Sequence, residues 1–345
     1  MNLLLSEEQT QIVDTLRHFL SEQADVARFR PPAPQLGNRD HELLPALAEL
    51  GVLGIAIPEE AGGTGLGCAE EAIVFREFGR HLLSPALIAH VLAAHVAYAC
   101  GETALLKSLL SGETRVGLAN PRDPLGDPRG TSEPIARACH LIEGRDADWV
   151  LVCDAHGTAL YARADFADVE AVDAMDHALA LDRARRLDVA PAAAMASGDA
   201  PLHARALVLA AAYGVGIAQA TLQMAVDYAK VREQFGKPIG SFQAVKHICA
   251  DMAMRAEAAA SQVAFASLSL TAGADAANFH ATASKLVAAD AALRNAQQNI
   301  QVHGAIGFTA EADAHVYLKR AHVIEQLWGD TRAQRERMLD VPFPG

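Results

Sequence analysis

The chain has 345 residues, of which 51% are hydrophobic and 5% aromatic, and its formal net charge is -13. This length suits two or three domains that share a core. The acidic surface argues against binding to nucleic-acid phosphates or to anionic membrane surfaces. The five cysteines form no CxxC pair and no cluster with zinc spacing, so we predict no metal site.

The N-terminal residues carry no basic region followed by an apolar run and a small-residue cleavage site, which a signal peptide would need. No apolar stretch is expected to reach the roughly 20 residues that span a bilayer. We therefore expect a soluble, cytoplasmic protein.

Helical patterns fill residues 1–112, which we take as an N-terminal helical domain. A capping-box pattern at Ser6 and Gln9 precedes apolar residues at helical spacing, so a helix begins near residue 7. The glycine- and proline-rich stretch 57–67 predicts a loop. Further helices are predicted over 40–51, 68–80, 84–100 and 102–111.

The composition changes in residues 113–198, where Pro, Gly and Asp are common and the apolar runs are short. Such runs, bounded by turn residues, are typical of strands. We predict a middle β domain with strands in WVLVC (149–153), TALYA (158–162) and RRLDVA (185–190).

Residues 199–345 are again helical and rich in alanine, the best helix former. Helices are predicted over 203–232, 241–271, 276–303 and 311–339. Long helices with short connections predict an antiparallel bundle. The first of them is apolar nearly all round, which predicts burial on several sides.

Two motifs in this segment carry the candidate chemistry. VREQFGKPIGSFQ (231–243) places Arg232 at the end of a long helix, before a turn. An arginine beside exposed turn amides can hold a diphosphate, although the same pattern also fits a plain helix–helix turn with a solvated arginine. IQVHGAIGFTAEA (300–312) contains a glycine turn, and glycine permits close approach to a ligand. His303 fits an interior histidine better than a catalyst.

Together, and at this separation, the two motifs resemble the acyl-CoA dehydrogenase family. The first is similar to that family's Arg-x-x-Phe-Gly segment with its following Gln, and QVHGAIGF is similar to Gln-x-x-Gly-Gly-x-Gly-Phe. LAELGVLGIAIPEEAGGTGLG (47–67) resembles the family's N-terminal glycine-rich stretch. The resemblance covers essentially the whole chain. It implies a mainly α fold with a central β domain: N-terminal helical domain, middle β-barrel-like domain and C-terminal four-helix bundle.

The resemblance implies an FAD site between the β domain and the C-terminal helices, shared across a subunit interface. Arg232 would contact the pyrophosphate of FAD. Ala305 replaces the second glycine of the family's pair and brings a methyl group towards the cofactor. The adenine and ribityl side would be lined by Phe235, Ile239, Phe242 and Gln243, and the adenosine end would be met from a neighbouring subunit by Gln301, Val302, Gly304 and Ala305.

The implied reaction is α,β-dehydrogenation of an acyl-CoA thioester, as in fatty acid β-oxidation. A carboxylate removes the Cα proton while the β-hydrogen leaves as hydride to flavin N5. Such a base must be desolvated, and fixed donors must stabilise the enolate oxygen. The implied partners are the acyl-CoA substrate, an electron-transfer flavoprotein and further subunits in a homo- or hetero-oligomeric dimer of dimers.

The catalytic base departs from the family pattern. Counting from Phe308 places the family's base on Trp328, whereas anchoring on Thr331 places it on Gly329. The family's alternative position maps near Ala206. None of these residues carries a carboxylate, so the chain has no acid at either position where the family keeps its base.

The nearest acids are Asp330, our candidate base, and Glu325. Three readings follow. The chain is an active dehydrogenase that uses Asp330 or another displaced acid, or it is a base-less partner subunit that completes a shared FAD site in a hetero-oligomer. The third is a helical scaffold that has lost the flavin.

The middle domain also departs from the family, whose members carry a Thr-Glu-Pro-x-Ala-Gly-Ser stretch and a Trp-x-Thr/Ser stretch against the flavin ring. Here LANPRDPLGDPRG (118–130), recognisable through Asn120-Pro121, is altered, and GRDADWVLV (144–152), in place of the second stretch, is shortened. The contacts to the flavin ring are therefore the part of the site that the motifs define least.

Overall fold

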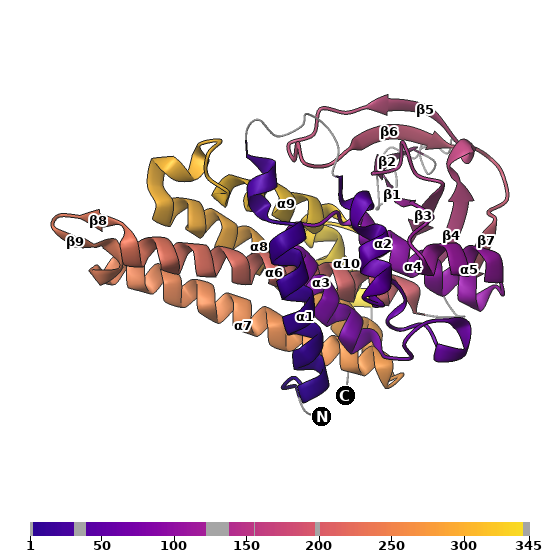
Figure 1. The fold of residues 1–345 in the computed structure, drawn as a ribbon, viewed down its shortest axis with the longest axis horizontal. Coiled ribbons are helices and arrows are strands. Elements are labelled where there is room, and N and C mark those ends of the chain that lie inside the picture. Colours follow the sequence, from indigo (N-terminus) through magenta and orange to yellow (C-terminus); the bar gives the residue numbers. More distant parts are fainter. Residues whose placement is uncertain (1–2, 31–38, 122–137, 155, 197–200, 341–345) are drawn as a thin grey trace.

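The structure is a computed structural model that describes residues 3–30, 39–121, 138–154, 156–196 and 201–340. Its elements fall into an N-terminal group of helices, a central sheet and a C-terminal group of longer helices (Figure 1). This order confirms the predicted mainly α architecture with a central β region.

The N-terminal group begins with the predicted capping box. The Ser6 hydroxyl accepts a hydrogen bond from the Gln9 amide at 3.1 Å, and the Gln9 side chain accepts one from the Ser6 amide at 3.0 Å. The predicted loop 57–67 contains only a short 3-10 turn. The helices are α1 (Glu7–Gln23), α2 (Leu44–Glu49), α3 (Cys68–Arg80), α4 (Ala86–Ala99) and α5 (Thr103–Leu110).

The central region forms one seven-stranded sheet in the order β5-β6-β2-β1-β3-β4-β7. β1 and β3 run parallel, and all other neighbours are antiparallel. The strand predicted over 185–190 was wrong in its bounds, because the sixth strand spans Leu181–Arg186. The strands are β1 (Val116–Pro121), β2 (Ala138–Ile142), β3 (Trp149–Cys153), β4 (Gly157–Ala162), β5 (Phe166–Ala171), β6 (Leu181–Arg186) and β7 (Ala193–Ala196).

The C-terminal group is built around α6, which packs against α3, α7 and α8. Two glycines permit the close contact between α3 and α6. A Cβ atom on Gly79 would lie 2.0 Å from the Tyr213 carbonyl oxygen, and one on Gly216 would lie 2.0 Å from that of Arg76. The elements are α6 (Leu202–Val231), β8 (Glu233–Gln234), β9 (Lys237–Pro238), α7 (Gln243–Thr271), α8 (Ala277–His303), α9 (Ala314–Gln326) and α10 (Thr331–Asp340).

The apolar character of α6 exceeds what the sequence analysis expected. Within the described part of the chain, α6 is the one helix long and apolar enough to cross a bilayer by length and composition. Yet 78% of its apolar window is buried inside the protein. Its apolar surface therefore packs against neighbouring helices, in agreement with the predicted burial on several sides.

The single helix predicted over 311–339 is wrong, because the chain breaks between α9 and α10. Trp328 and Gly329 both have left-handed backbone, with φ of 56° and 104°. A helix cannot continue through two such residues. The periodicity of the flanking residues concealed this turn, hereafter the 327–330 turn.

One buried arginine joins the three groups of elements. Arg320 of α9 is fully buried, and its Nε donates to Asp176, in the β5–β6 connection, at 2.6 Å. Its Nη1 donates to the carbonyls of Leu82 and Leu83 and to the Tyr213 hydroxyl, each at 2.7 Å. The ion pair and hydrogen bonds to Asp176 and Tyr213 outweigh the cost of burial and raise the pKa of this guanidinium.

Candidate functional site

The two sequence motifs lie at the same end of the C-terminal helices. The β8–β9 hairpin follows α6, and the turn after α8 lies beside it (Figure 1). The rings of Tyr228 and His303 stack at 4.2 Å between centroids. Val302 and Ile239 belong to one small hydrophobic cluster with Met252. We call this end, residues 228–243 and 300–308, the tip.

Arg232 ends α6 at the tip. Its carbonyl accepts a hydrogen bond from the Ile239 amide at 2.7 Å, which holds the hairpin closed. The Arg232 side chain is exposed and makes no ion pair within the described residues. Helix α7 begins directly after Phe242, and no side chain caps its first turn. The backbone of Arg232 and the uncapped N-terminus of α7 therefore lie at the same end of the bundle, an arrangement that suits an anionic group.

The tip also exposes apolar side chains. Phe235 is 91% exposed and has a left-handed φ of 54°, and its ring meets that of Phe242 edge to face at 6.1 Å. Ile306 and Phe308 are also exposed. Within a single subunit these side chains remain in solvent. This patch is an apolar surface that a ligand or another subunit can cover.

The residues of the second motif differ in exposure, although their positions in the sequence suggested a single ligand-contacting surface. Gln301, Gly304 and Ala305 are exposed, whereas the Val302 side chain is buried in the hydrophobic cluster of the tip. Only the Val302 backbone could meet a ligand. Gly304 has a φ of 67° and nothing within 4 Å of its Cβ position, so it ends α8 in open space. Gln243 is exposed, and its Nε2 lies 3.3 Å from Nε2 of His247.

His303 has an ordinary structural environment. Its Nδ1 lies 2.8 Å from the Asn299 carbonyl oxygen, which is one turn earlier in α8, and its ring stacks on Tyr228. These contacts agree with the prediction of an interior histidine rather than a catalyst.

The second region of interest is the 327–330 turn, where the family would keep its base. Trp328 is buried and its amide points to Asn120 Oδ1 on β1 at 3.4 Å. A Cβ atom on Gly329 would lie 3.1 Å from both Ala333 Cβ and Gln334 Nε2. Both positions that the resemblance offers for the family's glutamate, 328 and 329, thus have left-handed backbone, and a side chain at position 329 would also be crowded and strained.

Buried polar side chains hold the turn in place. Gln334 Nε2 donates to the Trp328 carbonyl at 2.8 Å and to the Gly329 carbonyl at 3.1 Å. Lys285 of α8 is fully buried and donates to the Glu325 carbonyl at the end of α9 at 3.0 Å. A cation at a helix C-terminus interacts favourably with the helix dipole. Sequence reasoning missed Lys285 because nothing in α8 signals a partner 40 residues later.

Burial lowers the pKa of Lys285 to about 8, although Glu325 and Asp330 act in the opposite direction. The buried ammonium is therefore costly to keep charged, and its retention beneath the turn needs a reason beyond packing.

Both candidate acids have structural contacts. Asp330 Oδ1 accepts a hydrogen bond from the Ala333 amide at 2.8 Å, which is the geometry of an N-cap for α10. Glu325 is buried, with Oε1 accepting from the Thr331 amide and Oε2 from the Gln326 side chain, each at 2.7 Å. The alternative position, Ala206, is fully buried within α6.

Two regions of the predicted site are not brought together in one subunit. The tip lies at the far end of α6 from the last turn of α10, since His203 in the first turn of α6 lies 3.3 Å from Arg337. Most of the altered stretch 118–130 falls outside the described residues. No group of three histidine, cysteine or acidic side chains that could hold a metal occurs among the described residues.

Comparison with known proteins supports the reading of the motifs. The family model described as "Acyl-CoA dehydrogenase, N-terminal domain" matches residues 6–113. The family model described as "Acyl-CoA dehydrogenase, C-terminal domain" matches residues 202–341. Acyl-CoA dehydrogenase IpdE2 of Mycobacterium tuberculosis is 31% identical over 335 residues, which cover 96% of each chain.

Acyl-CoA dehydrogenase FadE34 of the same organism is 38% identical over 295 residues. That match covers 84% of this chain but only 40% of FadE34. Among solved structures, a chain of the ChsE4-ChsE5 complex of Mycobacterium tuberculosis has a TM-score of 0.82 at 23% identity, with 100% of both chains covered. This last likeness shows the fold alone. The chain belongs to the acyl-CoA dehydrogenase family, whose members are FAD-dependent oxidoreductases that act on acyl-CoA thioesters.

Proposed function

We propose that this chain is the base-less partner subunit of a hetero-oligomeric acyl-CoA dehydrogenase, in which it completes a shared FAD site. The observation that carries the proposal is the 327–330 turn. Trp328 and Gly329, the two positions that the resemblance offers for the family's base, both have left-handed backbone, and a Cβ atom on Gly329 would be crowded by neighbours at 3.1 Å. The reading in which Asp330 acts as the base is disfavoured, because that carboxylate caps α10.

The tip fits FAD by its chemistry. Arg232 and the uncapped first turn of α7 offer a cation and free amide donors to a diphosphate. The exposed rings of Phe235 and Phe308 offer apolar contact to a planar group. When bound, FAD accepts the hydride of the reaction. The role of this chain's own residues is to bind and orient the cofactor's phosphates and to exclude water from its apolar parts.

Assembly follows from the same surfaces. The tip leaves Val231, Phe235, Ile306 and Phe308 exposed, and burying apolar surface of this kind is what drives subunit association. We infer a dimer of dimers in which this chain pairs with a homologous, base-carrying subunit. The ChsE4-ChsE5 complex, one chain of which shares this fold, is by its name an assembly of two different chains. Reoxidation of the reduced flavin would fall to an electron-transfer flavoprotein.

The test is the flavin spectrum and activity of the chain, purified alone and after co-expression with a base-carrying acyl-CoA dehydrogenase from the same genome. We expect little flavin and no turnover alone, and a yellow, active complex after co-expression. Within that complex, Asp330→Asn should keep its activity with an acyl-CoA and an artificial electron acceptor.

A yellow chain that alone oxidises an acyl-CoA, and loses this activity in Asp330→Asn, would overturn the proposal in favour of an active homo-oligomer. A chain that binds no flavin in either preparation would instead support the scaffold reading.

A further inference from the structure

A groove of about 360 Å³ lies between the N-terminal residues and three helices, α3, α6 and α7. Its lining residues on α3 are Ala69, Ala72, Ile73 and Arg76. They follow the i, i+3, i+4, i+7 spacing of one helix face, so α3 turns a single face towards the groove. Neither the tip nor the 327–330 turn contributes a residue to this groove.

One end of the groove is apolar. Leu3, Leu4 and Leu5 line it and are 44%, 80% and 41% exposed. The side chain of Gln9, which follows them in α1, donates to Glu70 in the first turn of α3 at 2.7 Å. The leucines therefore lie beside the start of α3, where an apolar ligand would bury their surface.

The other end of the groove is polar. Arg76, in the second half of α3, and Gln219 of α6 both line the groove. Arg80, one turn after Arg76, donates from Nη2 to Gln219 Oε1 at 2.8 Å, so these residues share one end. Because the amide oxygen of Gln219 accepts this hydrogen bond, its NH2 group is left as a donor.

The polar end carries an excess of positive charge. The guanidiniums of Arg17, Arg76 and Arg80 lie 3.0, 3.3 and 3.2 Å from the single carboxylate of Glu77. Burial alone would raise the pKa of Glu77, but the hydrogen bond from Arg17 and the charges of the three arginines lower it. One carboxylate cannot neutralise three cations. Glu257, on the rim formed by α7, is exposed, so solvent screens its charge.

The two ends define an amphiphile with an anionic head. Helix α7 lines the groove from Glu257 to Leu268, a rise of about 16 Å. With carbon–carbon bonds of about 1.5 Å, an extended hydrocarbon chain covers this length with roughly twelve carbons. The volume suits a small ligand. A helix about 10 Å across would lie over the groove instead of within it.

We propose that this groove binds a free fatty acid of medium chain length, with its carboxylate at Arg76 and Gln219 and its alkyl chain towards Leu3, Leu4 and Leu5. The proposal goes beyond the proposed function and does not rest on it. The acyl group of a thioester has no carboxylate to meet the arginine, so this groove differs in chemistry from a substrate site.

The test is calorimetric titration of the full chain with dodecanoate, hexanoate and dodecyltrimethylammonium, each below the concentration at which it forms micelles. Dodecanoate should bind about hundredfold more tightly than hexanoate, because the shorter chain buries less apolar surface. It should bind about tenfold more tightly than the cation of equal chain length. Equal affinity for the two long amphiphiles would overturn the anionic head, and equal affinity for the two acids would overturn the apolar end.

Two pairs of variants locate the site. Arg76→Gln should weaken dodecanoate binding about tenfold. Arg17→Gln also removes a partner of Glu77 but lies outside the groove, so it should change the affinity less than threefold. Ala264→Phe fills the groove and should abolish binding, whereas Ala258→Phe, at an exposed position of α7 outside the groove, should leave it unchanged.

Binding that persists in folded Arg76→Gln and in folded Ala264→Phe would place the fatty acid elsewhere and overturn the proposal. Failure of dodecanoate to bind the wild-type chain would also overturn it. If Ala264→Phe then alters the sedimentation of the chain, the groove holds another polypeptide. The proposed function is unaffected by these outcomes, because the flavin spectrum tests it separately.

Discussion

The tip and the 327–330 turn are two parts of one expected active site, yet they are built in opposite ways. The tip keeps the family's residues and leaves them exposed, with Arg232 unpaired and Phe235 in solvent. The turn has lost the family's carboxylate, and yet Lys285, Gln334 and Asn120 hold it from three sides.

This difference indicates which role the chain retains. Exposed rings and an arginine without an ion pair among the described residues suit a surface that a ligand or another subunit covers. A turn without function would not keep a buried cation beneath it, because burying a charge is costly. Under the proposed function, the chain combines a binding surface for a partner with a rigid site that lacks the base.

The largest expected effect concerns Lys285, the buried cation beneath the 327–330 turn. Burial lowers the Lys285 pKa from 10.5 to about 8, so between these pH values the unfolded chain holds a proton that the folded chain releases. The contribution of Lys285 to stability therefore rises as the pH increases from 8 to 10.5. Between pH 8 and 10.5, the unfolding free energy of the wild type should therefore rise by about 3 kcal/mol relative to that of Lys285→Met.

Urea unfolding of both proteins at both ends of that pH range measures this change. The other titrating groups are shared, so they cancel in the difference. A constant difference between the two proteins would mean that Lys285 is not held as a costly buried cation.

The next effect concerns the tip. Arg232→Ala should weaken FAD binding about thirtyfold, because a charge-assisted contact to the diphosphate is lost. The melting temperature of the flavin-free protein should not change, since Arg232 is exposed. Arg294 is an exposed arginine on α8 that pairs with Asp290, so Arg294→Ala is the matched control and should bind FAD normally. Equal losses in both variants would indicate a general charge effect.

A third measurement separates strain from crowding at the turn. Gly273 and Gly329 both have left-handed backbone, but only Gly329 has neighbours at its Cβ position. Gly273→Ala should destabilise the protein by about 1 kcal/mol, and Gly329→Ala by about 2 kcal/mol. Chemical denaturation gives both values. If the two substitutions cost the same, position 329 has room for a side chain, and restoring a glutamate there becomes feasible.

The smallest effect concerns Asp330. Because Asp330 is an N-cap, Asp330→Ala should destabilise the protein by about 1 kcal/mol. Asp330→Asn should cost almost nothing, because asparagine caps equally well. Thermal unfolding of the two variants tests this order. A large and equal loss in both would show that the negative charge, rather than the cap, is what the structure requires.

The sequence was most informative where the physics is local. The capping box at Ser6 and the long helices with their predicted ends at residues 232 and 303 follow from neighbouring residues, and the structure confirms them. The two motifs also converge at one end of the bundle, as expected of a shared ligand site.

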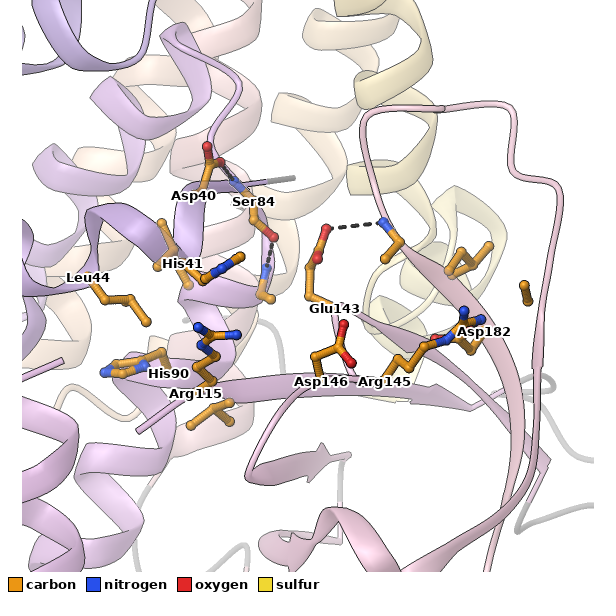
Figure 2. Close-up of a pocket in the computed structure, with 16 residues that line it drawn as sticks. Asp40, His41, Leu44, Ser84, His90, Arg115, Glu143, Arg145, Asp146 and Asp182 are labelled. Carbon is orange, nitrogen blue, oxygen red and sulfur yellow. Dashed lines mark hydrogen bonds and ion pairs between the residues drawn. The ribbon is translucent and has the colours of Figure 1, made fainter. Parts of the chain in front are cut away.

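The features that sequence reasoning missed depend on distant contacts. Nothing near Trp328 signals a left-handed turn, since a bulky residue rarely adopts that conformation, and it is held by Gln334 and by Asn120 from another domain. A cavity between the N-terminal helices and the sheet has the same origin. His90 and Asp182, which line it (Figure 2), lie on a helix and a strand far apart in the sequence, and the packing of these elements brings them together.

Arg320 has a consequence for how the molecule can be divided. Its guanidinium binds the N-terminal helices through Leu82 and Leu83, the sheet region through Asp176 and the bundle through Tyr213. A fragment cut at either junction would leave a buried charge or its acceptors stranded. The three groups should therefore melt as one cooperative unit in calorimetry, and none of them should survive as a separately expressed piece.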